Sequence, residues 1–365
     1  MIKRILVFYF ILFTMLCFPV SALESYQLEL RDGKVITFTT FSKIGEKALK
    51  VITDKGNGLT ITRKQLSDAE IIRRFGSLFL RNYGKAYPVQ SKLPKDYNPY
   101  EFRDSIKVRY EQMELLKWKN YFADLKYYLF KPDKKNIKSG EKVPLVIFFH
   151  GMGDQNHMGR HPQCLIFVQP EIQKKYPCYF IAPMLNNDKF DGWRGKNSLT
   201  KHNCTGSMES LFLLIDDMIT RYPNIDGDRI YVTGLSSGGI ACWEAIAKYP
   251  ERFAGAVPIA GASSALYEEM AKMKNKLKIG IWAFCNTTEI EYNRKYSIGL
   301  LKRVAKLGSD ARYSTFRITK QYDRDYKHSS SNPKLSSKHS AQNWAYAEPD
   351  LIPWLFSQKR TSAGK

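Results

Sequence analysis

The stretch RIYVTGLSSGGIACWEAIAKYPERF, residues 229–253, opens on a β-branched run and passes through glycines and serines into a helical pattern. Within it, Gly234 and Gly238 flank Ser236 in the pattern Gly-x-Ser-x-Gly. This pattern is typical of a serine held on a sharp turn between a strand and a helix. Glycines are needed on both sides because larger side chains would collide in such a turn. The stretch therefore predicts that Ser236 is an exposed nucleophile at the end of a strand.

Around this stretch, apolar strand patterns alternate with amphipathic helical patterns. The run PLVIFF at 144–149 is apolar without interruption, which is typical of a strand buried on both faces of a parallel sheet. We expect an α/β fold with a central, mostly parallel sheet flanked by helices. The expected strands are 125–132, 143–151, 178–185, 229–237, 254–262, 278–286 and 313–320, and the expected helices are 207–223, 238–249, 294–307 and 349–359.

Residues 1–22 have the parts of a secretory signal peptide. Lys3 and Arg4 give a basic start, an apolar run follows, and Ser21-Ala22 offers a small-residue cleavage site. An uncleaved membrane anchor is the alternative, because the apolar run is long and aromatic. We expect cleavage near Ala22 and a mature protein that is secreted, periplasmic or at the cell surface.

The rest of the chain falls into three regions. Residues 23–70 alternate apolar and polar residues around Asp-Gly and Lys-Gly-Asn-Gly turns, which predicts a small β module. The module resembles the SH3-like modules of the SLA1-homology type in its Asp32-Gly33-Lys34 turn and its LSDAE stretch. A spacer role is favoured for it over ligand binding. Residues 71–115 form a polar, aromatic-rich connector, and residues 116–360 carry the α/β pattern.

The chain is strongly basic, with a formal net charge of +22 at pH 7. Such a charge favours anionic partners. The lysines are scattered rather than clustered, however, so a solvated surface is the simpler interpretation and an anionic polymer is the alternative. We expect no nucleic-acid partner, because no motif for one is present.

The cysteines are spaced too widely for a CxxC-type metal site, and no metal or organic cofactor is expected. In an oxidising compartment we expect one disulfide among Cys164, Cys178 and Cys204, without a choice of pair. Cys242 and Cys285 lie in core-forming patterns and are expected to be small buried residues.

A serine nucleophile that forms a tetrahedral intermediate needs two donors for the developing oxyanion. The backbone amide of Ser237, next after the nucleophile, is one candidate. The second is expected in the loop after the strand VPLVIFF, where the amide of Met152 is preferred and that of Gly151 is the alternative. His150 precedes the serine and is interpreted as shaping this loop rather than as a catalytic base.

In this architecture the acid and then the histidine follow the serine along the chain. His339 directly precedes the terminal helical pattern, whereas His328 lies in a Ser/Lys-rich loop, so His339 is the predicted base. The acid is expected just after the strand at 278–286, where Glu289 and Glu291 are both candidates.

Residues 115–360 resemble the phospholipase/carboxylesterase-like secreted esterases of the α/β-hydrolase fold, which are related to prolyl-oligopeptidase-type and polyester-depolymerase-type hydrolases. The resemblance rests on VPLVIFFHGMGD, on the stretch from NIDGDRIYVTG to VPIAGA, on IWAF and on AYAEPDLIPWLFSQKR. It implies hydrolysis of carboxylic esters through an acyl-enzyme. It also implies a triad of Ser236 as nucleophile, His339 as base and Glu289 as acid, where the family usually has aspartate.

The polar segment 183–204 follows a strand at the same expected sheet edge, and Trp193 and Arg194 in it would form a platform for a sugar or an acyl group. Export and the resemblance together imply an esterase that removes acetyl or feruloyl groups from polysaccharides. A serine peptidase or thioesterase of the same fold is one alternative. A catalytically degenerate secreted binding protein is the other.

Overall fold

The structure is a computed structural model of the 365-residue chain. It describes residues 26–29, 35–44, 48–53, 55, 57–62, 86–94, 96–119, 124–151, 162–184, 208–262, 266, 270, 278–287, 289, 291–316 and 339–360. By its internal contacts the chain divides into two compact units, residues 1–71 and 72–365. The expected signal peptide lies outside the described residues. In the part that is described, no helix is long and apolar enough to cross a membrane.

The smaller unit contains an antiparallel sheet whose strands follow one another in chain order. The strands described there are β1 (Tyr26–Glu29), β2 (Val35–Ile44), β3 (Ala48–Thr53) and β4 (Gly58–Thr62). The likeness of this unit to SH3-like modules stays a prediction.

The larger unit is built on a sheet of nine strands among the described residues, in the order β5-β13-β12-β11-β10-β8-β9-β7-β6. Only the pairs that β7 makes are antiparallel, so the predicted mostly parallel sheet is confirmed. The strands are β5 (Ala86–Pro88), β6 (Glu114–Lys119), β7 (Asp124–Phe130), β8 (Val143–Phe149), β9 (Tyr179–Met184), β10 (Ile225–Leu235), β11 (Gly255–Ile259), β12 (Gly280–Asn286) and β13 (Asp310–Phe316).

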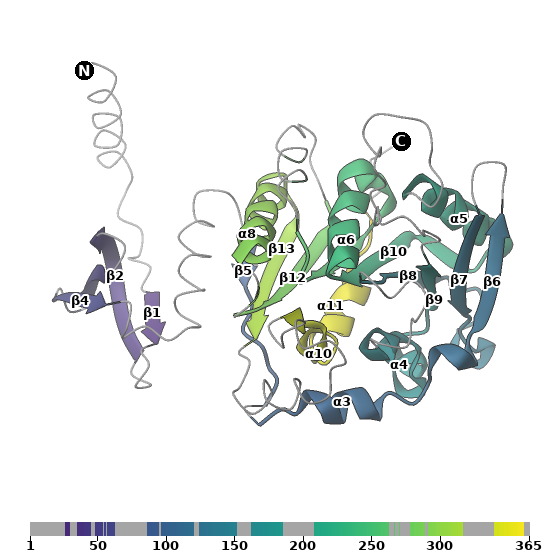
Figure 1. The fold of residues 1–365 in the computed structure, drawn as a ribbon, viewed down its shortest axis with the longest axis horizontal. Helices are drawn as coiled ribbons and strands as arrows, with labels where there is room; N and C mark the ends of the chain where they lie inside the picture. The colour runs from purple at the N-terminus through teal and green to yellow at the C-terminus, as the bar shows by residue number, and fades with distance from the viewer. Residues whose placement is uncertain are drawn as a thin grey trace, which may run out of the picture. The chain divides into compact units, whose positions relative to one another are not determined.

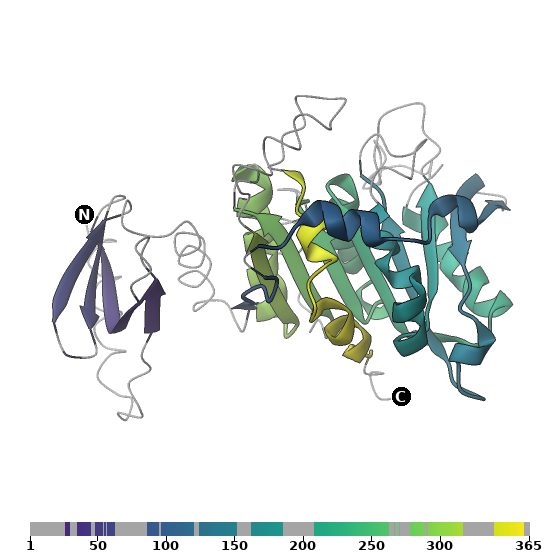
Figure 2. The same cartoon turned by 90° about the horizontal axis from the view of Figure 1, so that it is seen from below.

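Helices cover both faces of this sheet, as Figures 1 and 2 show. One face carries α5 (Met208–Arg221), α6 (Ser237–Lys248) and α8 (Glu291–Lys306), and the other carries α3 (Pro99–Ser105), α4 (Pro170–Lys175), α10 (Gln342–Ala345) and α11 (Leu351–Ser357). Short 3-10 helices lie at Tyr110–Gln112, Lys134–Asn136, Pro162–Val168 and Pro250–Arg252.

The uninterrupted apolar run of β8 is explained by this sandwich of helices. Every residue of β8 is buried. Leu145, Ile147 and Phe149 belong to the core that contains side chains of α5, α6 and α8. Val146 and Phe148, which point the other way, belong to the core that contains side chains of α10 and α11. Burial of each such side chain contributes about 2 kcal/mol to the free energy of unfolding. The central strands therefore form a rigid base for the segments that follow their carboxyl ends.

The described part of the predicted connector, residues 71–115, contributes to the sheet and the core of the larger unit. Its residues include β5, which adds an edge strand beside β13, and α3. Ile106 and Tyr110, from the same region, are buried in the core on the α10 and α11 face. A strand of three residues has too short a pattern to be recognised without its neighbour.

The expected disulfide is wrong. Any pair among the three candidate cysteines would use Cys164 or Cys178, and both are buried thiols that form no disulfide. The Sγ of Cys164 lies 3.1 Å from the hydroxyl of Tyr110, and the Sγ of Cys178 accepts a hydrogen bond of 3.2 Å from Nε2 of Gln173. Both thiols are therefore packed as small core groups with polar neighbours of their own.

Candidate active site

Ser236 stands between β10 and α6 with a backbone conformation that non-glycine residues rarely adopt. Its φ is 59° and its ψ is −116°. The turn is held from both sides, because the amide of Ser236 donates to the carbonyl of Ile259 at 2.9 Å and its own carbonyl accepts from Ile240 at 3.0 Å. A non-glycine residue at positive φ persists only where its surroundings enforce it, and such residues cluster at functional sites.

The glycines on either side of the serine make this turn sterically feasible. A Cβ on Gly238 would overlap the carbonyl oxygen of Phe149, the last residue of β8. A Cβ on Gly234 would lie 2.6 Å from that same oxygen and 2.6 Å from the carbonyl oxygen of Gly238. The close approach of α6 to the end of β8 therefore depends on the absence of side chains at both positions.

The carboxyl ends of four neighbouring strands meet at this edge. Gly234 of β10 is in register with Phe149 of β8, and Leu235 is in register with Ile259 of β11. Ile259 is in turn in register with Phe284 of β12. The serine turn, Gly151 and the segment that carries Glu289 consequently follow strand ends on the same side of the sheet, which is the usual location of ligand sites in such sheets.

Glu289 and His339 form a hydrogen-bonded pair at this edge. Nδ1 of His339 lies 2.8 Å from Oε1 of Glu289. The side chain of Glu289 has no exposed surface and that of His339 is 18% exposed. A carboxylate accepts, so the histidine donates from Nδ1, and its other ring nitrogen, Nε2, is left as the basic one. This is the relation that an acid has to the base in a serine triad.

The segment that carries His339 is anchored to the sheet and to the predicted connector. The hydroxyl of Tyr346 lies 2.9 Å from Oγ1 of Thr233, a residue of β10 three positions before the serine. The hydroxyl of Tyr97 donates to the carbonyl of Asn343 at 2.6 Å. These contacts fix the short helix α10, and with it the position of the histidine just before it.

The remaining predicted site residues are placed in part. Gly151 is buried directly beyond the end of β8, and Ser237 is the first residue of α6, whose opening amides have no partner inside the helix. Glu291 begins α8, but its side chain lies outside the described residues. Met152, Trp193, Arg194 and His328 also lie outside the described residues.

Sequence reasoning missed one polar residue of this edge, Asn293. Its Nδ2 lies 3.3 Å from Oε1 of Glu289 and 3.1 Å from the carbonyl of Ala260. Glu289 lies before α8 and Asn293 lies in its first turn, so the two are not a pair within one helix and no sequence pattern signals their contact.

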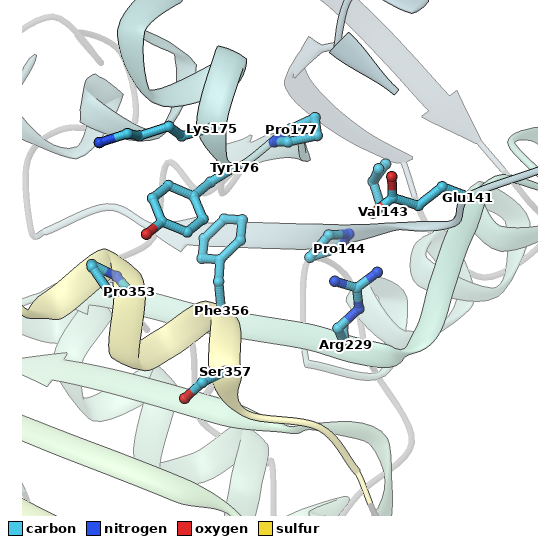
Figure 3. A pocket seen from close by; sticks show the side chains of 10 residues that line it. All are labelled: Glu141, Val143, Pro144, Lys175, Tyr176, Pro177, Arg229, Pro353, Phe356 and Ser357. Carbon is cyan, nitrogen blue, oxygen red and sulfur yellow. The ribbon is translucent and has the colours of Figure 1, made fainter. Parts of the chain in front are cut away.

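A pocket of about 300 Å³ lies at the opposite edge of the sheet (Figure 3). Val143 and Pro144, at the amino end of β8, contribute to its wall. The rings of Tyr176 and Phe356 line it and contact one another edge-on, with centroids 5.4 Å apart. Because the serine turn follows the carboxyl end of β10, this pocket is not part of the candidate active site.

The mostly parallel sheet, the helices on both faces and the serine on its strained turn define the α/β-hydrolase fold. The crystal structure of a thermostable esterase shares the fold, with a TM-score of 0.53 and 23% identity over 89% of this chain and 74% of that one. The model of the phospholipase/carboxylesterase family matches residues 135–287. This match, over less than half of the chain, confirms the resemblance drawn from the sequence.

Two curated proteins are similar over shorter stretches. Poly(3-hydroxyalkanoate) depolymerase C of Paucimonas lemoignei is 38% identical over 76 residues, which are 21% of this chain and 18% of that protein. Acetylxylan esterase A of Emericella nidulans is 33% identical over 111 residues, which are 30% of this chain and 32% of that protein. The chain thus spans about a third or less of the length of these relatives.

Proposed function

We propose that this chain is a secreted serine carboxylic-ester hydrolase with Ser236 as nucleophile, His339 as base and Glu289 as acid. The observation that carries the proposal is the 2.8 Å hydrogen bond between His339 and the buried Glu289, at the sheet edge where Ser236 stands on its strained turn. The match of residues 135–287 to the phospholipase/carboxylesterase family model supports ester hydrolysis as the reaction class.

The first half of the reaction acylates the serine. Nε2 of His339 takes the proton of the Ser236 hydroxyl as Oγ attacks the ester carbonyl carbon. The negative oxygen of the tetrahedral intermediate is held by the amide of Ser237 and by an amide of the 151–152 loop. The intermediate collapses as Nε2 returns the proton to the departing alcohol, and the acyl group stays on Ser236. Glu289 stabilises the imidazolium that forms on the way and keeps Nδ1 protonated.

The second half regenerates the enzyme. Water gives a proton to Nε2 of His339, and its oxygen attacks the acyl carbon through the same oxyanion site. The bond to Ser236 then breaks, the proton passes to its Oγ, and the carboxylic acid leaves. Atoms and protons balance with water as the only co-reactant, so this scheme uses no cofactor.

The substrates that we propose are acyl esters on polysaccharides, with acetyl or feruloyl groups. The similarity to an acetylxylan esterase supports an ester-bearing polymer, and secretion would bring the enzyme to it. Trp193 and Arg194 are proposed to contact the sugar or the acyl group.

The experiment is labelling with a fluorophosphonate probe, followed by release assays on p-nitrophenyl acetate, acetylated xylan and feruloylated arabinoxylan. We expect labelling at Ser236 and its loss in Ser236→Ala. Ser105→Ala, an exposed serine on α3, is the matched control and should label and turn over normally. A wild-type protein that the probe does not label would overturn the proposed function. Labelling with hydrolysis of peptide or thioester substrates in place of oxygen esters would overturn its substrate class.

A further inference from the structure

Asn293 connects the proposed acid to the strand beside the serine. Its side-chain amide nitrogen lies 3.3 Å from Oε1 of Glu289 and 3.1 Å from the carbonyl oxygen of Ala260. An amide NH₂ has two hydrogens, so one nitrogen can donate to both acceptors at once. Asn293 is half-buried in the first turn of α8, directly after the loop that carries the acid.

Ala260 is a fixed point for this bridge. It follows the last residue of β11, and its amide donates to the carbonyl of Phe284 in β12 at 2.8 Å. The residue before it, Ile259, accepts the hydrogen bond from the amide of Ser236. A chain of contacts therefore runs from the serine turn through the end of β11 and Asn293 to the carboxylate.

A glutamate in the acid position needs such a support. Compared with aspartate it has one more rotatable bond, and ordering that bond costs free energy. Its carboxylate has no exposed surface, so protein donors must replace the water that it lost. His339 supplies one donor to Oε1 and Asn293 supplies another to the same oxygen.

We infer that Asn293 is a positioning residue that holds the carboxylate of Glu289 in the orientation in which it receives Nδ1–H of His339. The inference rests on the proposed function, because it assigns Asn293 to the same triad. The amide acts through the acid and does not touch the substrate.

Two substitutions separate the donor from the volume of the side chain. Asn293→Ala removes both and should lower kcat for p-nitrophenyl acetate about tenfold with KM little changed. Asn293→Asp keeps the shape but places a second carboxylate beside Glu289, so the loss should be larger. Lys295→Ala, an exposed residue of the same helix, is the control and should keep the wild-type kcat.

A double-mutant cycle distinguishes positioning from a general structural role. If Asn293 acts through the carboxylate, Asn293→Ala should cause no further loss of kcat in a Glu289→Gln background. A loss that is the same in both backgrounds would overturn the inference. Thermal unfolding of each variant shows whether it is folded. If Asn293→Ala does not fold, the cycle with Glu289→Gln is repeated with Asn293→Asp.

A spectroscopic readout tests the inference without catalysis. In the folded wild-type protein the Nδ1 proton of His339 should give a downfield NMR resonance, assigned by its loss in His339→Ala. The resonance should be broadened or lost in Asn293→Ala and kept in Lys295→Ala. A wild-type protein that hydrolyses no ester would end the proposed function but leave this test in place. An unchanged resonance in Asn293→Ala would end the inference alone.

Discussion

Nδ1 of His339 lies 2.8 Å from Oε1 of Glu289, although 50 positions separate the two residues in the chain. The fold brings them together because β12 ends at the same sheet edge toward which α10 and Tyr346 direct the histidine segment. With Nδ1 engaged by a buried carboxylate, only Nε2 of the ring is available to a nucleophile. The orientation of this pair gives the first prediction.

Glu289→Gln should lower kcat by about 10³-fold, because an amide can hold the imidazole in the wrong tautomer and does not stabilise its charged form. Steady-state hydrolysis of p-nitrophenyl acetate measures the effect. Glu291→Gln is the matched control, since it removes a carboxylate two positions away, and it should retain activity. The reverse outcome would assign the acid to Glu291.

The histidine assignment is tested by the same assay. His339→Ala should reduce kcat at least about 10³-fold, because the proposed triad would lose its base. His328→Ala should remain close to wild type. Wild-type turnover in His339→Ala would contradict the assignment, and loss in His328→Ala alone would move the base to that residue.

Gly238→Ala should destabilise the protein by about 3 kcal/mol, because the new Cβ overlaps the backbone carbonyl of Phe149 and neither backbone segment can yield cheaply. Gly227→Ala, in the same strand–helix unit, is the matched control because a Cβ there meets nothing within 4 Å. Guanidinium unfolding of the two variants gives the comparison. Equal stabilities would show that the turn accommodates a side chain.

The local part of the site was predictable from its sequence, and the long-range part was not. The glycines around Ser236 and the switch from strand to helix period lie within one short stretch, so the turn could be read from neighbouring residues. The pairing of Glu289 with His339 depends on which strands are neighbours in the sheet. From the residues alone Glu291 and His328 competed with them, and the choice of Glu289 came from the family resemblance.

Asn293 and the cysteines show why other features of the structure could not be predicted from the sequence. From the sequence, an asparagine at the start of a helix is interpreted as a solvated residue. In the structure, the carbonyl of Ala260 lies beside the Asn293 side chain and accepts a hydrogen bond from it. Cys164 and Cys178 read as disulfide candidates because their segments looked loop-rich, yet both pack into the core. In each case the deciding partner comes from another element, and no pattern within one segment specifies it.

The described cysteines should resist thiol reagents in the folded protein. Burial raises the pKa of the Cys178 and Cys285 thiols to about 12, and it raises the pKa of Cys242 well above its ordinary value. The thiolate is the reactive form, so at pH 8 we expect no maleimide labelling of these three or of the buried Cys164. Peptide mapping by mass spectrometry, with and without denaturant, checks this. Rapid labelling of any of the four without denaturant would show that its site opens.

Lys302 should make stability depend on pH above neutrality. It is 8% exposed in α8, and desolvation lowers its pKa from 10.5 to about 8. Between pH 8 and 10.5 the unfolded chain therefore holds a proton on this lysine that the folded chain does not, so this residue makes stability rise with pH in that window. Below pH 8 the folded chain holds the charged form of Lys302 in a buried position, so the full desolvation cost lowers the free energy of unfolding.

Lys302→Met removes that cost, so its stabilising effect should be greatest at pH 7 and should shrink as the pH approaches 10.5. Urea unfolding of wild type and variant at pH 7 and at pH 10 measures the difference. Lys295→Met, on the exposed side of the same helix, controls for the loss of a lysine from α8. A stabilisation by Lys302→Met that stays constant or grows with pH would contradict the lowered pKa.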